Sequence, residues 1–187
     1  MRSRSRAALL AAAATLTALA GGPTLGGLAA PREAQAFGLR ISQHQRPALS
    51  FPLSAAPDYG DGLGADRGHE GVDLFAPAGT AELAVSDAIV IEAAAGDNGG
   101  RGNYVSIYDP AADRTYSYFH MLAPPLVRAG ERVRAGEKLG ELGCSGSCWG
   151  DHLHFEVRQG RNAYGPVLDP LPLLERLVRT APSRDLA

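Results

Sequence analysis

The chain has 187 residues, of which 23 are Gly and 13 are Pro, so turn-forming residues are about half again as common as in an average protein. Hydrophobic residues make up 45% and charged residues 20%, a balance that supports a packed core and excludes a disordered chain or a coiled coil. The formal net charge of −2 leaves no basic excess for binding nucleic acid, and the length predicts one compact domain.

The N-terminal segment has the three parts of a secretory signal peptide. Three arginines precede the uncharged apolar stretch 7–20, and Ala-Gln-Ala at 34–36 offers a small-residue cleavage site. We predict that residues 1–36 are removed on export, leaving a product with a net charge of about −5 and no membrane span, in the periplasm or outside the cell. An uncleaved membrane anchor is the alternative, but Gly-Gly-Pro at 21–23 interrupts a run already shorter than the ~20 residues of a spanning helix.

Residues 37–50 are predicted to form an irregular lead-in to a folded domain at 51–174, followed by a tail at 175–187. Strands are predicted where β-branched and aromatic residues form runs bounded by Gly or Pro. The expected strands cover residues 49–53, 81–93, 103–108, 115–120 and 152–158. The connection at 109–113 has the length and residue types of a hairpin turn.

Two further features complete the predicted fold. Arg-Ala-Gly-Glu occurs twice between residues 128 and 137, and each Ala-Gly pair suits a tight turn, although two copies are too few for a solenoid. Apolar residues recur at helical spacing in 170–179, which predicts a single helix. The sequence therefore predicts an all-β domain, mainly of antiparallel sheet, closed by a short C-terminal helix.

The histidines are the most informative residues. His69 and Asp73 are four residues apart, and Gly71 between them disfavours a helix. Residues i and i+4 share a face in an extended segment, as they do in a helix, so the two side chains should converge. An imidazole and a carboxylate brought together suit a divalent transition metal, zinc first.

A second motif lies in residues 152–157. His152, His154 and Glu156 alternate with three apolar residues, so one face of the strand should pack while the other carries chemistry. The alternative is that both imidazoles are structural, buried in the core with their hydrogen bonds made there. His120, at the end of an expected strand, is ambiguous from the sequence alone, and His44 has no partner nearby and is given no role.

These motifs resemble those of the lysostaphin-like zinc metallopeptidases, which cleave peptide cross-links of bacterial peptidoglycan. The resemblance covers roughly residues 51–174. It rests, in chain order, on His-x-Gly-x-Asp at 69–73, Gly-Asn-Tyr-Val at 102–105, Tyr-x-His at 118–120 and His-Leu-His-Phe-Glu at 152–156. It implies a small antiparallel domain of the barrel-sandwich, or duplicated hybrid motif, type with a groove, and one zinc ion held by His69, Asp73 and His154.

The resemblance also implies that His120 and His152 are catalytic residues that do not bind the metal. Three protein ligands leave the fourth zinc position open for a water that the metal activates. Glu70 should point away from His69 in an extended segment, so the two catalytic histidines must handle protons. One would deprotonate or orient the water, and the other would stabilise the oxyanion and protonate the leaving amine. Glu156 is either an acceptor that fixes an imidazole tautomer or a solvated carboxylate.

The loop before the last expected strand departs from the family pattern, because Cys148 and Trp149 stand where small hydroxyl residues usually occur. Cys144 and Cys148 are the only cysteines, and export predicts a disulfide between them that stiffens the loop. A metal site near His152, or free thiols, are the alternatives. Trp149 either packs against the loop or stacks on substrate. Asn103 is a further candidate groove residue.

The sequence thus predicts an exported zinc endopeptidase that acts on peptidoglycan peptides as a monomer, without a nucleic-acid partner. A non-catalytic relative that binds cell wall or activates an amidase is the alternative, but such relatives typically lose ligands, and all are present here. A lipoyl-type or biotinyl-type carrier is disfavoured, because the single lysine, Lys138, is not in the hairpin-tip context that a carrier lysine needs.

Overall fold

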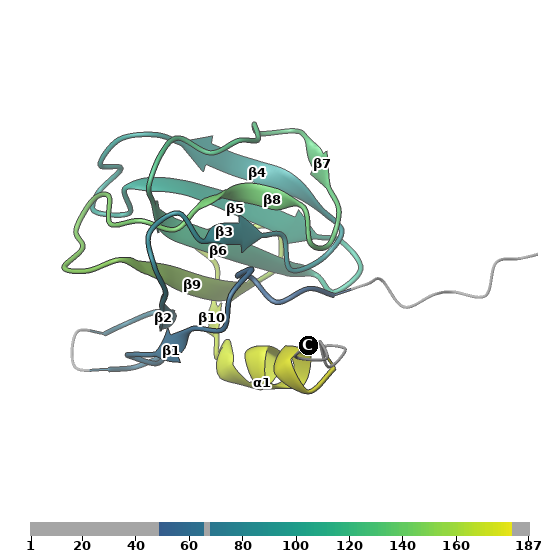
Figure 1. The fold of residues 1–187 in the computed structure, drawn as a ribbon. Coiled ribbons are helices and arrows are strands. Elements are labelled where there is room, and N and C mark those ends of the chain that lie inside the picture. Colours follow the sequence, from purple (N-terminus) through teal and green to yellow (C-terminus); the bar gives the residue numbers. More distant parts are fainter. Residues whose placement is uncertain (1–48, 66–67, 181–187) are drawn as a thin grey trace, which may run out of the picture. The chain divides into compact units, whose positions relative to one another are not determined.

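The computed structural model describes residues 49–65 and 68–180, so the predicted signal peptide and most of the lead-in lie outside the described residues. Within these residues the chain forms short strands and a helix (Figure 1). In chain order the elements are β1 (Asp58–Tyr59), β2 (Val72–Phe75), β3 (Ala81–Leu83), β4 (Ala88–Ala94), β5 (Asn103–Asp109), β6 (Arg114–Met121), β7 (Arg132–Val133), β8 (Lys138–Glu141), β9 (His152–Gln159), β10 (Val167–Leu168) and α1 (Leu171–Thr180).

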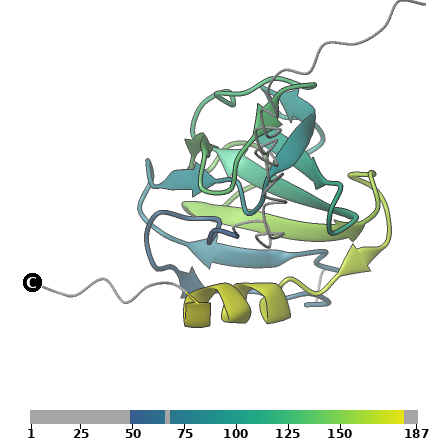
Figure 2. The ribbon, with the colours of Figure 1, turned by 90° about the vertical axis from the view of Figure 1, so that its right-hand side faces the viewer.

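The strands form two sheets. The larger has the order β1-β2-β9-β6-β5-β4-β7, with β10 paired to β9, and the smaller consists of β3 and β8. Every pair is antiparallel, which confirms the predicted all-β, mainly antiparallel class. In Figure 1 the small sheet lies in front of the large one, and the helix lies at the end where β1 and β10 are found. Figure 2 shows the same arrangement turned by 90°.

The core fills the space between the sheets. Alternate residues of the central strands face it, as the period of a strand requires. The core side chains from β5, β6 and β9 are Val105, Ile107, Tyr116, Tyr118, Met121, Leu153, Phe155 and Val157, and Leu139 and Leu142 join them from β8 and the residue after it. The other face of the same three strands carries buried polar side chains, and the site is built there.

The helix agrees with the prediction to within one residue. Asp169 caps its N-terminus, because Oδ1 of this side chain accepts a hydrogen bond from the backbone N–H of Leu171 at 3.0 Å. Leu174 and Leu177 are buried in the core, so the packed part of the helix continues past residue 174. Among the described residues no helix is long and apolar enough to cross a membrane.

Two strand predictions were wrong. Residues 81–93 do not form one strand, because the chain crosses from the small sheet to the large one between β3 and β4. The N–H of Val85 at this crossing donates to the hydroxyl of Tyr118 instead of to a neighbouring strand. Residues 49–53 form no strand either, since only Leu53 makes an isolated bridge, to Glu82. Strands β1, β7, β8 and β10, with two to four residues each, are too short to show a periodicity.

The turns agree with the sequence. Both copies of Arg-Ala-Gly-Glu form the same turn, in which the Gly has a positive φ, 93° in the first copy and 81° in the second. In each copy the backbone N–H of the Arg donates to the carboxylate of the Glu at 3.0 Å. The connection between β5 and β6 is a tight turn, closed by hydrogen bonds from the N–H groups of Ala111 and Ala112 to Asp109 Oδ1.

Glu82 is an exception to the apolar character of the core. This middle residue of β3 is completely buried, and neither carboxylate oxygen has a hydrogen-bond partner among the described residues. Burial raises the pKa of Glu82 well above its ordinary value of 4.5. The side chain therefore stays protonated in the folded protein at a pH where it would ionise in the unfolded chain.

Replacing Glu82 with Leu should raise the free energy of unfolding at neutral pH by about 1–3 kcal/mol, because it removes a buried polar group without a partner. The raised pKa means that the folded state holds a proton which the unfolded chain releases near pH 4.5. The stability that this proton provides is thus lost as the pH rises from there toward the folded-state pKa. The free energy of unfolding, measured with urea across this pH range, should decline less for Glu82→Leu than for the wild type. Glu175→Leu, on the exposed helix surface, is the control, and an equal effect there would contradict the assignment.

Candidate active site

The register of β2 and β9 brings two of the predicted metal ligands together. The strands pair with Asp73 directly opposite His154, so both side chains leave the sheet on one face. His69 lies just before β2, and its Nδ1 is 2.9 Å from the carbonyl oxygen of Gly62. A carbonyl only accepts, so Nδ1 carries the hydrogen and Nε2 is directed toward the other two residues.

The three candidate ligand atoms are His69 Nε2, Asp73 Oδ1 and His154 Nδ1. Each pair of them is 2.9 Å apart, and all three residues are buried. Ligand atoms bound at about 2.0–2.2 Å to a tetrahedral zinc ion would be about 3.3–3.6 Å apart, so shifts of about half an ångström separate this arrangement from a zinc site. Two imidazole nitrogens and one carboxylate oxygen are also a donor set that zinc uses. The residues therefore fit a zinc ion.

The same atoms compete strongly for protons. Burial works against a charged His154, but its hydrogen bonds to Asp73 and Glu156 outweigh burial and raise the pKa of His154. Burial also works against the carboxylate of Asp73, but the neighbouring histidines, His154 foremost, hold the pKa of Asp73 below its ordinary value. A metal ion would take the place of the shared proton, so metal binding should release protons and weaken as the pH falls.

Gly71 gives β2 room to approach β9. A Cβ atom at this position would lie 2.6 Å from the carbonyl oxygen of Phe155 and 2.9 Å from Nε2 of His154. Both distances are too short for a real side chain, so only glycine allows the two strands to pair this closely.

Two further imidazoles face the same cluster. His152, next on the polar face of β9, places Nε2 3.7 Å from Asp73 Oδ1, and its Nδ1 donates to the carbonyl of Gly150 at 2.7 Å. The ring centroid of His120 is 4.8 Å from that of His152, and its Nδ1 donates to the carbonyl of Ser145 at 2.8 Å. Both rings, when neutral, therefore keep an unprotonated Nε2.

His120 is held neutral by its surroundings. Burial lowers the pKa of His120 to about 4, and the nearby His152 and His154 add to this effect against the opposing effect of the Ser145 carbonyl. Near neutral pH its Nε2 is consequently a proton acceptor.

His120 reaches the site through an irregularity at the end of β6. On a regular strand Phe119 and His120 would point to opposite faces, and Phe119 already faces the site, with its ring stacked on His154 at 5.4 Å. The register of β5 and β6 shifts at this point, and His120 has a φ of 65°. This bulge turns the imidazole back toward His152, a local strain of the kind found at functional sites.

Glu156 forms a buried network behind His154. It is 4% exposed; Oε1 lies 3.3 Å from His154 Nε2, and Oε2 accepts from Arg158 Nε at 2.8 Å. The same guanidinium donates to the carbonyl of Gly165 and to the exposed carboxylate of Glu70. This geometry favours the acceptor interpretation of Glu156, since a bond at Nε2 directs Nδ1 of His154 toward the metal-binding cluster. Glu70 takes no part in that cluster.

Similarity to known proteins covers the part of the chain that holds the candidate site. Residues 67–166 match the model of peptidase family M23. The chain belongs to this family. It is 40% identical over 144 residues to the peptidoglycan DD-endopeptidase ShyC from Vibrio cholerae, a match that covers 76% of this chain and 30% of ShyC. The chain spans 26–31% of the length of the first curated relatives that it matches.

Solved structures of M23 peptidases share the fold. Lysostaphin from Staphylococcus simulans matches with a TM-score of 0.62 and 27% identity, over 74% of this chain and 59% of that one. A zinc containing peptidase from Vibrio cholerae matches with a TM-score of 0.55 and 28% identity, over 65% of this chain and 39% of that one. The resemblance that the motifs indicated is therefore confirmed.

A cavity of about 490 Å³ lies over the cluster in this M23 domain. It is lined by His69, Asp73, His120, Ser147, Cys148, Trp149, His152 and His154. Trp149 is 75% exposed, which favours a position at the edge of the cavity over packing against the loop. The side chain of Asn103, in contrast, is used within the fold, because it donates to the carbonyl of Met121 and accepts from the N–H of Gly96.

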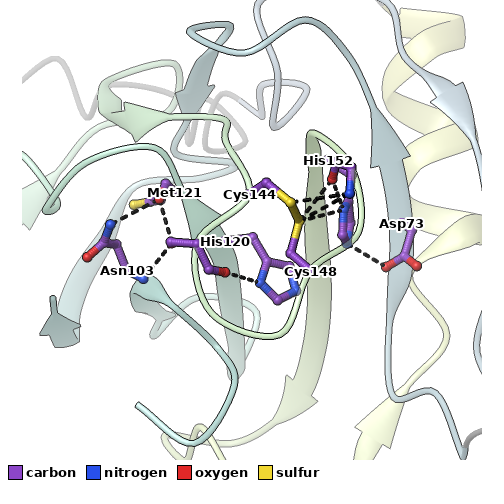
Figure 3. Close-up of a disulfide and its surroundings, with 9 residues drawn as sticks. Asp73, Asn103, His120, Met121, Cys144, Cys148 and His152 are labelled. Atoms are coloured by element: carbon purple, nitrogen blue, oxygen red, sulfur yellow. Dashed lines mark hydrogen bonds and ion pairs between the residues drawn. A yellow bond between two sulfur atoms is a disulfide. The ribbon is translucent and has the colours of Figure 1, made fainter. Parts of the chain in front are cut away.

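The predicted disulfide between Cys144 and Cys148 is present (Figure 3). It precedes β9 and lies beside both catalytic candidates, His120 and His152. Ser145 and Gly150, whose carbonyl groups orient these two imidazoles, were not predicted as part of the site. Backbone carbonyls leave no signal in residue types, so nothing in the sequence could have identified them.

Changing Gly71 to Ala should push β2 away from β9. We expect zinc affinity to fall about tenfold or more and the free energy of unfolding to fall by about 1–3 kcal/mol, the usual cost of overpacking. Calorimetric zinc titration and urea unfolding measure the two effects. Gly150→Ala is the matched control, since its Cβ would meet nothing within 4 Å. Similar losses in both variants would show that the close approach at Gly71 is not the cause.

Changing Glu156 to Gln should weaken zinc binding on the order of 10- to 100-fold, because an amide oxygen is a poorer acceptor than a carboxylate for the N–H of a metal-binding histidine. Glu70→Gln removes the other carboxylate partner of Arg158 without touching His154. It should leave zinc affinity nearly unchanged. Titration of both variants against a competing chelator tests this difference, and equal affinities would argue against a role for Glu156 behind His154.

Proposed function

We propose that this chain is a zinc endopeptidase that hydrolyses peptide cross-links of bacterial peptidoglycan. The observation that carries the proposal is the convergence of five side chains on one cavity: His69, Asp73 and His154 as metal ligands, and His120 and His152 as groups that handle protons. A domain that only bound cell wall would have no need for both sets.

The metal site supports hydrolysis of an amide bond. A zinc ion, when bound, supplies a Lewis acid and lowers the pKa of a coordinated water. The chain's contribution is to hold His69, Asp73 and His154 with their ligand atoms facing inward, through the Gly62 carbonyl, the β2–β9 register and the Glu156 carboxylate. Three ligands leave room for a fourth.

The two remaining histidines support proton transfer at this site. Hydrogen bonds at Nδ1 leave Nε2 of both His120 and His152 unprotonated in the neutral rings. One Nε2 accepts the proton of the attacking water. The imidazolium so formed then donates a hydrogen bond to the oxyanion and passes its proton to the departing amine, which returns the ring to its neutral form. Because the rings are 4.8 Å apart, both can reach one peptide bond.

The relatives support the substrate class. ShyC is by name a peptidoglycan endopeptidase, and this chain aligns with it over 144 residues. An acidic product without a basic surplus would have to recognise the wall through its cavity instead of by general attraction to anionic polymers. The leader at residues 1–36 supports export to the compartment where peptidoglycan lies, and we propose that the exported chain acts as a monomer with one zinc ion.

Purified residues 37–187 incubated with peptidoglycan should release fragments with new amino termini, and a chelator should stop the release. Mass analysis of the fragments identifies the bond. His154→Ala should lose both zinc and activity, because it removes a ligand. His152→Ala should keep most of its zinc while its turnover falls by about 100-fold or more.

Each result bears on a different part of the proposal. If the zinc-loaded protein released no new amino termini, the endopeptidase function would be wrong and a wall-binding role would stand in its place. Equal loss of zinc in His152→Ala and His154→Ala would overturn the division between ligands and proton-handling residues.

A further inference from the structure

We propose that the disulfide between Cys144 and Cys148 is a positioning device for His120 and His152, so that this M23 domain is fully active only while the bridge is closed. The effect on turnover rests on the proposed peptidase function. The positioning itself is a property of the chain and can be measured without substrate.

The ring that the disulfide closes, residues 144–148, holds His120 through Ser145. The backbone N–H of Ser145 donates to the carbonyl of His120 at 3.3 Å, and the carbonyl of Ser145 accepts from His120 Nδ1 at 2.8 Å. The Ser145 hydroxyl donates to the carbonyl of Met121 at 2.6 Å and accepts from the N–H of Asn103 at 2.9 Å. Ser145 thus holds the main chain and the imidazole of His120, and also the adjacent ends of β5 and β6.

The sulfur atoms hold His152 through Gly150. The N–H of Gly150 points at the bridge, 3.2 Å from Cys144 Sγ and 3.5 Å from Cys148 Sγ. The carbonyl of the same residue accepts from His152 Nδ1 at 2.7 Å, and Cys148 Sγ is 3.8 Å from that nitrogen. The two imidazoles are therefore oriented from the two sides of one covalent ring.

The ring has little freedom to move while it is closed. Gly146 packs directly on the backbone of Gly100 and Gly102, with no space for a side chain, and the N–H of Ser147 donates to the carbonyl of Gly100 at 2.8 Å. Gly146 has a φ of 74°, which glycine adopts readily. Opening the bridge removes the disulfide constraint on residues 144–148. The backbone of His120, which has a left-handed conformation, then loses the rigid loop that holds it in place.

The metal ligands are held by different contacts. Gly62 orients His69, whereas the pairing of β2 with β9 orients Asp73 and His154, and Glu156 adds a further contact to His154. None of these contacts involves the ring. Opening the bridge should therefore affect proton transfer while the metal remains bound.

The test compares the oxidised and reduced forms of the zinc-loaded protein. A water-soluble phosphine is used because a dithiol would compete for zinc. It breaks the S–S bond and becomes the phosphine oxide by taking the oxygen of one water, whose two protons go to the two thiolates. Intact mass with and without alkylation confirms the reduction.

The decisive readout is the tautomer of each imidazole, from nitrogen-15 NMR of labelled histidine. We expect His120 and His152 to carry hydrogen on Nδ1 in the oxidised form and to become mixtures of tautomers on reduction. The value of kcat on peptidoglycan should fall on the order of 10- to 100-fold, while zinc affinity changes by less than about threefold.

Two sets of variants complete the test. The double variant C144S/C148S should behave like the reduced protein and should not respond to the phosphine. Ser145→Ala, which removes the hydroxyl that ties the ring to Met121 and Asn103, should lower kcat in the same direction. Ser54→Ala loses a hydroxyl that accepts from the N–H of Ala81 at the start of β3 and should leave kcat unchanged.

Unchanged tautomers together with an unchanged kcat after full reduction would overturn the proposal, as would loss of zinc in step with activity. If the double variant did not fold, the reduced wild type would decide by the same readouts. If the chain showed no peptidase activity at all, the tautomers would still report whether the ring positions the histidines, so failure of the function and failure of this inference can be told apart.

Discussion

The pairing of β2 with β9 is the contact on which the site depends. Its register is fixed on the core side, where Val72 lies opposite Phe155 and Leu74 opposite Leu153, all at most 1% exposed. A slip by one residue would move these apolar side chains to the other face, which the hydrophobic effect strongly opposes. Because side chains alternate along a strand, the same register leaves Asp73 no position except opposite His154. The apolar core thus sets the geometry of the candidate metal site.

The face that carries the site is polar and also buried, which is costly unless each group finds a partner. The hydroxyls of Ser106 and Ser117 bond each other at 2.8 Å, and Glu156 pairs with Arg158 at 2.8 Å. These bonds hold the polar face in one arrangement, so the imidazoles near it have few alternative positions. Glu82 in the core shows the contrast, because its carboxyl has no partner among the described residues and burial raises its pKa well above the ordinary value.

The parts of the fold that follow a simple period were predictable from the sequence. Alternation placed His152, His154 and Glu156 on one face of β9, and helical spacing located α1. The break between β3 and β4 was missed, because Ala84 and Val85 continue the apolar run beyond β3, and the polar pair Ser86 and Asp87 interrupts that run only briefly. Such a crossing depends on tertiary pairing, which a local pattern does not contain.

His120 shows the same limit within the site. Strict alternation would send its side chain into the core, and only a bulge with a positive φ brings it back to His152. The family motif identified this residue, but backbone groups of Arg101 and Ser145 hold its main chain, and residue types carry no information about such contacts.

The site therefore has two parts that are held by different means. Strands locked by the core orient the candidate metal ligands, whereas a loop orients the two histidines proposed to handle protons, through two carbonyl groups. A loop has fewer constraints than a sheet and opens at a lower free energy, so the second part is the one that needs additional support. A covalent bridge placed inside that loop stiffens it without altering the strands. Its short span makes it a weak source of global stability, so its physical effect is concentrated on Ser145 and Gly150, next to the two imidazoles.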